Sequence, residues 1–242
     1  MAKSHKKKHN AQQERAQERH KERLAAAKAQ QSKSTKRMVI GAVILLALVI
    51  AFFSVYNSIK VTTDGLEPLS LYEISEYDSV KGNGSVLVHK YSDFQCPACK
   101  NSLSIVADML AQYGEDVTFV YRHFPLSSIL PKGTYAAQAV EAARLQGNFW
   151  EMHDIIFERQ DEWSAGNERL LFSEYAQEIG LDVAQFDVDV ISPGVRAVVS
   201  LHSQSGHALG VSATPTFFVN GRQIQLRTTT DLAQAVEREL VQ

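Results

Sequence analysis

Cysteine is scarce in this sequence, because the 242 residues hold only two, Cys96 and Cys99. A fold stapled by several disulfides is therefore excluded. A closed structural zinc site takes about four ligands, and the chain has no second C-x-x-C to complete one, although two half-sites could still meet in a dimer. Proline and glycine, with 6 and 13 residues, are too rare for a collagen-like or low-complexity chain. The composition is that of an ordinary folded protein.

Acidic residues are scarce in the first 37 residues and basic residues are outnumbered in the rest, although the formal net charge is only −2. Residues 1–37 hold 12 Lys/Arg against 3 Asp/Glu, a balance of +9. The remainder holds 13 Lys/Arg against 24 Asp/Glu, a balance of −11. Two electrostatically different parts are thus joined in one chain.

The two parts meet at residues 38–56, an uncharged and mostly apolar run. A helix of this length rises about 1.5 Å per residue and roughly spans the hydrocarbon core of a bilayer. A buried core helix is usually shorter, and a signal peptide ends in small residues, whereas Phe52, Phe53 and Tyr56 are bulky. We therefore expect a transmembrane anchor. The basic flank predicts that the tail lies in the cytoplasm and the rest lies outside.

The basic tail over residues 1–37 has helix-forming residues but no apolar stripe, so we expect a disordered or partly helical arm. Its charge could attract anionic lipid or nucleic acid. No aromatic residue interleaves the basic ones, as single-stranded nucleic-acid binding would favour. The simpler interpretation is that the tail only sets membrane topology and binds no nucleic acid.

After a predicted stem at residues 57–84, which is rich in turn residues, residues 85–242 predict an α/β domain. The expected order is strand–helix–strand, then a helical block at about residues 128–192, then a further helix, two strands and a last helix. Strands are expected at 85–91, 116–122, 213–221 and 222–226, and helices at 97–113, 134–146, 149–160, 168–179, 183–191, 194–209 and from 231 onward.

The cysteine pair follows the first predicted strand and opens the helix, with Pro97 in the first turn. A lone C-x-x-C is compatible with half a zinc site, a redox pair or chance. The position favours a redox pair, because free N–H groups and the dipole at a helix N-terminus stabilise a thiolate. Cys96 is then the expected nucleophile, and Cys99, one turn further in, resolves the mixed disulfide.

Four segments, in order, resemble the DsbA-like branch of the thioredoxin superfamily: residues 91–100 (YSDFQCPACK), 123–126 (HFPL), 147–153 (GNFWEMH) and 213–221 (ATPTFFVNG). The resemblance covers about residues 78–242. It implies a thioredoxin-like fold into which the helical block is inserted. It also identifies Thr214 and Pro215 as the family's cis-proline loop, which would face the cysteines and pair with an extended substrate.

Two positions depart from the family pattern. DsbA has Pro-His between its cysteines where this chain has Pro97 and Ala98, and the lost imidazole should make Cys96 less acidic. Family members commonly carry an acid six residues before the first cysteine, where this chain has Lys90. A neutral lysine could act as a base for Cys99, and a charged one would favour the thiolate. Alternatively, Lys90 reaches solvent and pairs with Asp93.

We therefore predict a membrane-anchored thiol–disulfide oxidoreductase that works without a cofactor or a metal. Its expected partners are cysteine-containing extracytoplasmic proteins and a membrane redox protein that re-oxidises the pair. Introduction of disulfides is the favoured direction. A reductase or isomerase is the alternative enzymatic interpretation, and a non-catalytic, membrane-tethered redox sensor is the alternative outside enzymes.

Overall fold

The computed structural model describes residues 41, 46–47, 49–50 and 69–241. The chain divides into residues 1–60 and 61–242, and the second unit carries the sheet described here. Among the described residues, no helix has the length and apolar character needed to cross a bilayer. The predicted tail and most of the predicted anchor at 38–56 lie outside the described residues, so both stay predictions.

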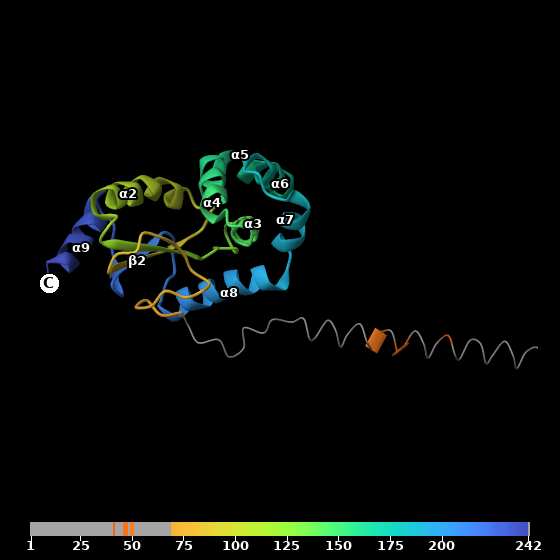
Figure 1. Cartoon of the computed structure of the whole chain (residues 1–242), viewed down its shortest axis with the longest axis horizontal. Helices are drawn as coiled ribbons and strands as arrows, with labels where there is room; N and C mark the ends of the chain where they lie inside the picture. The colour runs from red at the N-terminus through yellow and green to blue at the C-terminus, as the bar shows by residue number, and fades with distance from the viewer. Residues whose placement is uncertain (1–40, 42–45, 48, 51–68, 242) are drawn as a thin grey trace, which may run out of the picture. The chain divides into compact units, whose positions relative to one another are not determined.

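A five-stranded sheet lies at the centre of the second unit (Figure 1). Its strand order is β1-β3-β2-β4-β5. β2 and β3 are parallel, because a helix carries the chain back between them. The other three pairings are antiparallel. The strands are β1 (Ser79–Lys81), β2 (Val86–Ser92), β3 (Val117–His123), β4 (Thr216–Val219) and β5 (Arg222–Ile224).

Helices pack against the sheet, and a group of helices lies to one side of it (Figure 1). α2 crosses between β2 and β3 and packs against α9. Five helices between β3 and α8 form the helical block. The helices are α2 (Pro97–Tyr113), α3 (Gly133–Arg144), α4 (Phe149–Glu158), α5 (Gln160–Ala165), α6 (Glu168–Glu178), α7 (Val183–Val190), α8 (Pro193–Ala208) and α9 (Asp231–Leu240).

Strand alternation sends side chains of β2 to opposite faces of the sheet. Val88 belongs to the main apolar core, which α2, the helical block and α9 complete. Tyr91 belongs to a second, smaller cluster, and its hydroxyl hydrogen-bonds Ser205 of α8 at 2.7 Å. The sheet is therefore buried on both faces.

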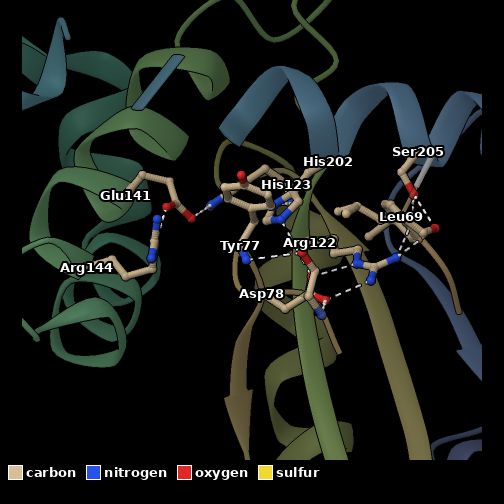
Figure 2. Close-up of polar contacts among 11 residues, drawn as sticks. Leu69, Tyr77, Asp78, Arg122, His123, Glu141, Arg144, His202 and Ser205 are labelled. Carbon is tan, nitrogen blue, oxygen red and sulfur yellow. Dashed lines mark hydrogen bonds and ion pairs between the residues drawn. The ribbon is translucent and has the colours of Figure 1, made fainter. Parts of the chain in front are cut away.

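β1 was not expected, because it lies within the predicted stem at 57–84. Asp78, the residue before β1, attaches this segment to the sheet: its carboxylate accepts two hydrogen bonds of 2.8 Å from Arg122 of β3. Both side chains are fully buried. Figure 2 shows this pair beside the imidazole of His202 from α8. Residues 69–81 thus belong to the folded unit, because a buried ion pair and a sheet pairing bind them to β3.

The other predicted elements differ from the structure mainly at their ends. The mixed α/β thioredoxin-like fold and the helical insertion are confirmed. The single helix predicted over 149–160 is instead two helices, α4 and α5, separated at Arg159. The break places Gln160 so that its buried amide reaches the cysteine loop, where it donates hydrogen bonds to the carbonyl oxygens of Phe94 and Cys96.

Candidate active site

Cys96 lies where β2 gives way to α2 and occupies the N-cap of that helix. No side chain caps the helix, and Pro97 fills its first position. The first N–H groups of α2 have no intrahelical partner, so they and the helix dipole face the cysteine sulfurs. The loop itself is fixed by a hydrogen bond of 3.1 Å from Cys96 N–H to the carbonyl oxygen of Asp93.

Cys96 is 9% exposed, and its thiol is free in this structure. Its hydrogen bond with Cys99 makes the largest contribution in lowering its pKa from 9.0 to about 5. The side chain of Thr214 and the backbone N–H groups of Cys99 and Ala98 add to this, and burial opposes it. Cys96 is therefore a thiolate at neutral pH, the form that attacks a disulfide.

Cys99 lies one turn further into α2 and is completely buried. Burial, followed by the hydrogen bond with Cys96, holds the pKa of its thiol well above the ordinary value, although Lys90 and Ser92 oppose this. Its sulfur accepts a long hydrogen bond, 3.5 Å, from Asp93 N–H. One cysteine of the pair is thus ionised and reachable, and the other is protonated and enclosed.

Lys90 projects from β2 beneath the pair and is only 1% exposed. Its Nζ donates a hydrogen bond of 3.3 Å to the carbonyl oxygen of Cys99 and lies 5.4 Å from the ring centre of Phe157. Burial lowers its pKa from 10.5 to about 8, against the attraction of the two cysteines. The alternative in which Lys90 reaches solvent is therefore wrong.

Asp93 does not pair with Lys90, so that part of the prediction is also wrong. Its carboxylate instead accepts hydrogen bonds of 2.8 Å from Gln95 N–H and 2.7 Å from Leu126 N–H. Burial raises its pKa against these two bonds. Asp93 therefore connects the cysteine loop to the loop after β3. Gly133 lies so close to this carboxylate that a Cβ there would be 2.3 Å from Oδ1.

The loop before β4 faces the pair, as the resemblance implies. The Thr214–Pro215 peptide bond is cis. The thiol of Cys96 lies 3.4 Å from the carbonyl oxygen of Thr214, and the Thr214 hydroxyl is buried in the same loop. Pro97 and Ala98, between the two cysteines, are exposed.

A groove of about 530 Å³ begins at Ala98 and runs between α2 and β5. Pro215 and Thr216 form one wall, and Asn101 and Ile105 of α2 form the other. Ile224 and Leu226 add apolar surface at the far end. The arrangement can hold an extended polypeptide beside Cys96, because its walls offer both apolar contact and backbone groups.

Two buried residues that fix the cysteine loop were missed from the sequence. Ser102 donates a hydrogen bond of 2.7 Å to the carbonyl oxygen of Cys99. Gln160 donates to the carbonyl oxygen of Cys96 at 3.1 Å from 64 residues away. No sequence signal marks Gln160, because nothing in a polar residue of the helical block indicates that its helix turns toward the cysteines.

One group within the described part of the chain has the residue types of a metal site. His123, Glu141 and His202 are all buried and offer ligand atoms within 4.8 Å of one another. Glu141, however, hydrogen-bonds His123 at 2.8 Å and pairs with Arg144 (Figure 2). The two imidazole rings are stacked, so their in-plane nitrogen lone pairs do not converge on one point. His123 and Arg144 thus hold the Glu141 carboxylate, whereas Nδ1 of His123 and Nε2 of His202 are buried without a hydrogen-bond partner.

Several known proteins are similar to this chain in sequence, in fold or in both. A family model described as thioredoxin matches residues 78–238. A Na(+)/H(+) antiporter NhaA 1 of Mycolicibacterium vanbaalenii is 37% identical over an alignment of 191 positions, which covers 74% of this chain and 30% of the antiporter. The chain thus spans about a third of the length of the curated relatives it matches first.

Solved structures agree with this family. A thioredoxin-like oxidoreductase from Silicibacter pomeroyi is 26% identical, with a TM-score of 0.59 over 69% of this chain and 95% of that one. Oxidised BdbD from Bacillus subtilis is 20% identical and shares the fold, with a TM-score of 0.61 over 73% of this chain and 100% of that one. DsbA proteins share the fold as well. The chain therefore belongs to the thioredoxin family, and its fold and cysteine pair are those of a thiol–disulfide oxidoreductase.

Proposed function

We propose that this protein introduces disulfides into extracytoplasmic proteins by exchange at Cys96 and Cys99. The observation that carries the proposal is the contrast between the two thiols, an ionised Cys96 beside the Thr214 loop and a protonated, buried Cys99. In such a pair a substrate can form a mixed disulfide at Cys96 while Cys99 leaves as the protonated thiol.

Exchange begins when a substrate thiolate attacks Sγ of Cys96 in the oxidised pair. The Cys96–Cys99 bond breaks, its electron pair stays on Cys99, and Cys99 takes up a proton. A second substrate thiolate then attacks the substrate sulfur of the mixed disulfide. The substrate leaves with a disulfide, and Cys96 leaves as a thiolate, so the pair has gained the two electrons that the substrate lost.

Two features favour oxidation of the substrate over the reverse reaction. A Cys96 pKa of about 5 stabilises the reduced pair, which makes the disulfide form a better oxidant. Lys90 is mostly protonated at neutral pH and places a positive charge beneath the pair, with the same effect. Re-oxidation would then fall to a membrane redox protein, because each turnover leaves the pair as a dithiol.

The proposed location is the outer side of the cell membrane, with the domain tethered by residues 38–56. It is supported by the uncharged run at 38–56 and by the basic residues that precede it, which favour a cytoplasmic tail. Oxidising compartments also lie outside the cytoplasm, where a pair that donates disulfides can work.

The test uses the full-length chain with Cys99→Ser, in which Cys96 can form mixed disulfides with substrates but no Cys99 thiol remains to displace them. We expect covalent complexes with several secreted proteins, all released by a reducing agent and none formed by the Cys96→Ser, Cys99→Ser double variant. In cells, alkylation of free thiols should show the wild-type pair mostly as a disulfide. A mostly dithiol pair would favour the reductase or isomerase, and an absence of trapped proteins would favour a redox sensor.

A further inference from the structure

Gln160 connects the helical block to the loop that carries the cysteines. It is the first residue of α5, lies 64 residues beyond Cys96 in the sequence and is only 3% exposed. Its Nε2 donates hydrogen bonds of 2.6 Å to the carbonyl oxygen of Phe94 and 3.1 Å to that of Cys96. A primary amide has two N–H donors, so both donors of Gln160 are used on this loop.

The two carbonyl groups need this amide for different reasons. Within the described part of the chain, Gln160 is the only donor to the buried Phe94 carbonyl, so its loss would leave that acceptor unpaired. The Cys96 carbonyl also accepts from the N–H groups of Cys99 at 3.1 Å and Lys100 at 3.3 Å, in the first turn of α2. Gln160 thus bonds the carbonyl from which that helix starts.

The first turn of α2 bears directly on the reactive sulfur. The pKa of Cys96 is lowered to about 5 by its hydrogen bond with the Cys99 thiol first, and also by the backbone N–H groups of Cys99 and Ala98. Because the Cys99 N–H also bonds the Cys96 carbonyl, the position of that carbonyl and the direction of this N–H are linked. An amide that holds the carbonyl therefore helps to hold the backbone donors on the sulfur.

A second connection runs from the same loop to the other end of α5. The side-chain oxygen of Gln95 accepts a hydrogen bond of 2.9 Å from Lys132 N–H. Nζ of Lys132 in turn donates to the carbonyl oxygens of Trp163 at 3.2 Å and Gly166 at 2.6 Å, where α5 ends. The cysteine loop and α5 are therefore joined at two places, through Gln160 at the start of the helix and through Lys132 at its end.

α5 is itself held firmly in the helical block. The Trp163 side chain is completely buried, and its Nε1 donates a hydrogen bond of 2.7 Å to the carbonyl oxygen of Ile156 in α4. Its ring packs edge-on against Phe172 of α6. Gln160 is thus presented by a supported element, and such support keeps the groups of a site in their productive geometry.

We infer that Gln160 is a positioning residue for exchange at Cys96, and that α5 holds its amide so that the first turn of α2 stays directed at the reactive sulfur. The inference rests on the proposed function, because the orientation of this turn matters only for a cysteine that reacts. Gln160 acts through the carbonyl groups of Phe94 and Cys96 and not on the sulfur itself. Through it, the inserted helical block sets the reactivity of a cysteine at the end of the sheet.

The experiment removes the amide and measures the acidity of Cys96 in the reduced, full-length chain. Gln160→Met keeps the length of the side chain and removes both donors. We expect it to raise the pKa of Cys96 from about 5 to about 6, read from the ultraviolet absorbance of the thiolate against pH. A less acidic Cys96 destabilises the reduced pair, so the equilibrium with reduced and oxidised glutathione should shift about tenfold toward the Cys96–Cys99 disulfide.

A matched control separates this effect from a general loosening of the helical block. Nε2 of Gln146 donates a hydrogen bond of 3.2 Å to the carbonyl oxygen of Asp182, and its Oε1 accepts one of 2.9 Å from Asp182 N–H. Gln146→Met removes this comparable pair of bonds between α3 and α7, so its Cys96 titration and glutathione equilibrium should match wild type. Gln160→Asn serves as a second test, because its shorter, polar side chain withdraws the amide from both carbonyls and should raise the Cys96 pKa by less.

A cooperative unfolding transition in denaturant identifies the variants that are folded. An unchanged Cys96 titration in a folded Gln160 variant overturns the inference. An equal shift in Gln146→Met overturns it as well, because the effect then belongs to the helical block as a whole. If the wild-type pair reaches no equilibrium with glutathione, the exchange function itself fails, which is a different outcome from normal exchange with an unchanged Cys96 pKa in the variants.

Discussion

The thiol of Cys96 lies 3.4 Å from the carbonyl oxygen of Thr214, although 118 residues separate them in the sequence. This contact places the nucleophile beside a backbone that can pair with an extended chain. It also places the buried hydroxyl of Thr214, which favours the Cys96 thiolate, within the site. A substrate strand that runs along this loop would therefore bring its sulfur to the more reactive of the two cysteines.

The acidity of Cys96 should depend on Cys99 first and on Thr214 second. The ultraviolet absorbance of the thiolate, followed against pH in the reduced chain, should give a pKa of about 5. Cys99→Ala should raise it most, because the hydrogen bond from Cys99 is the largest favourable contribution, and Thr214→Val should raise it less. An unchanged titration in Cys99→Ala would contradict this origin of the thiolate.

Lys90 should make the reduced protein less stable at neutral pH. Its pKa falls from 10.5 in an unfolded chain to about 8 in the fold, so the unfolded state binds more protons between these values and stability rises with pH there. Below pH 8 the full cost is present, about 3 kcal/mol. Lys90→Met, of similar volume, should raise the free energy of unfolding at pH 7, and this gain should shrink from pH 8 upward.

Denaturant unfolding of the reduced chain across this pH range measures the effect. A Lys90→Met gain that stays constant up to pH 10 would mean that the amine does not titrate in the fold. The same variant should also make the Cys96–Cys99 disulfide harder to reduce, because the charge that favours the thiolate is gone.

His89 should destabilise the fold in mild acid. It is completely buried on the α8 face of the sheet, and neither ring nitrogen has a hydrogen-bond partner. Burial, followed by repulsion from Arg122, lowers its pKa from 6.5 to about 4. The unfolded chain then binds the proton first, so stability is complete above pH 6.5 and falls as the pH drops toward 4.

His89→Leu should flatten the dependence of unfolding free energy on pH between 6.5 and 4. The control is Phe218→Leu, because Phe218 pairs with His89 across the strands and is also buried. Phe218→Leu should lower the unfolding free energy by a similar amount at every pH, so the dependence of that free energy on pH should match that of wild type. Equal slopes in wild type and His89→Leu would show that another group accounts for the acid sensitivity.

The Asp78–Arg122 pair should be essential to the fold. Asp78→Asn leaves the buried guanidinium of Arg122 without its counter-charge, which should cost about 3–5 kcal/mol of unfolding free energy. Glu178→Gln removes half of a comparable pair with Arg159 at the surface and should barely move the unfolding midpoint. Similar losses in both variants would contradict the packing of residues 69–81 against β3.

The elements around the cysteines could be predicted because their signals are local. The strand-to-helix junction can be located within about ten residues from turn residues, a β-branched run and Pro97. The Asn-Gly turn likewise marks the hairpin of β4 and β5. The position of the Thr214–Pro215 loop opposite Cys96 could be predicted only from the family resemblance, since no local sequence signal indicates this contact.

The missed features depend on tertiary contacts. Nothing in the sequence indicates that Asp78 pairs with Arg122 of β3. The segment that forms β1 was therefore included in the predicted stem. The partner of Lys90 was misjudged because Asp93 is close in sequence, whereas its carboxylate bonds Leu126 across the fold.

The most direct test of exchange at Cys96 and Cys99 is to count disulfides. The oxidised full-length chain is mixed with a reduced peptide that holds two cysteines, quenched in acid and analysed by mass spectrometry. We predict that one peptide disulfide appears for each Cys96–Cys99 disulfide lost, through an adduct on Cys96 that the second thiol of the peptide resolves. Cys99→Ser cannot form the starting disulfide and should therefore yield no peptide disulfide. Peptide oxidation no faster than with the Cys96→Ser, Cys99→Ser double variant would contradict the proposed function.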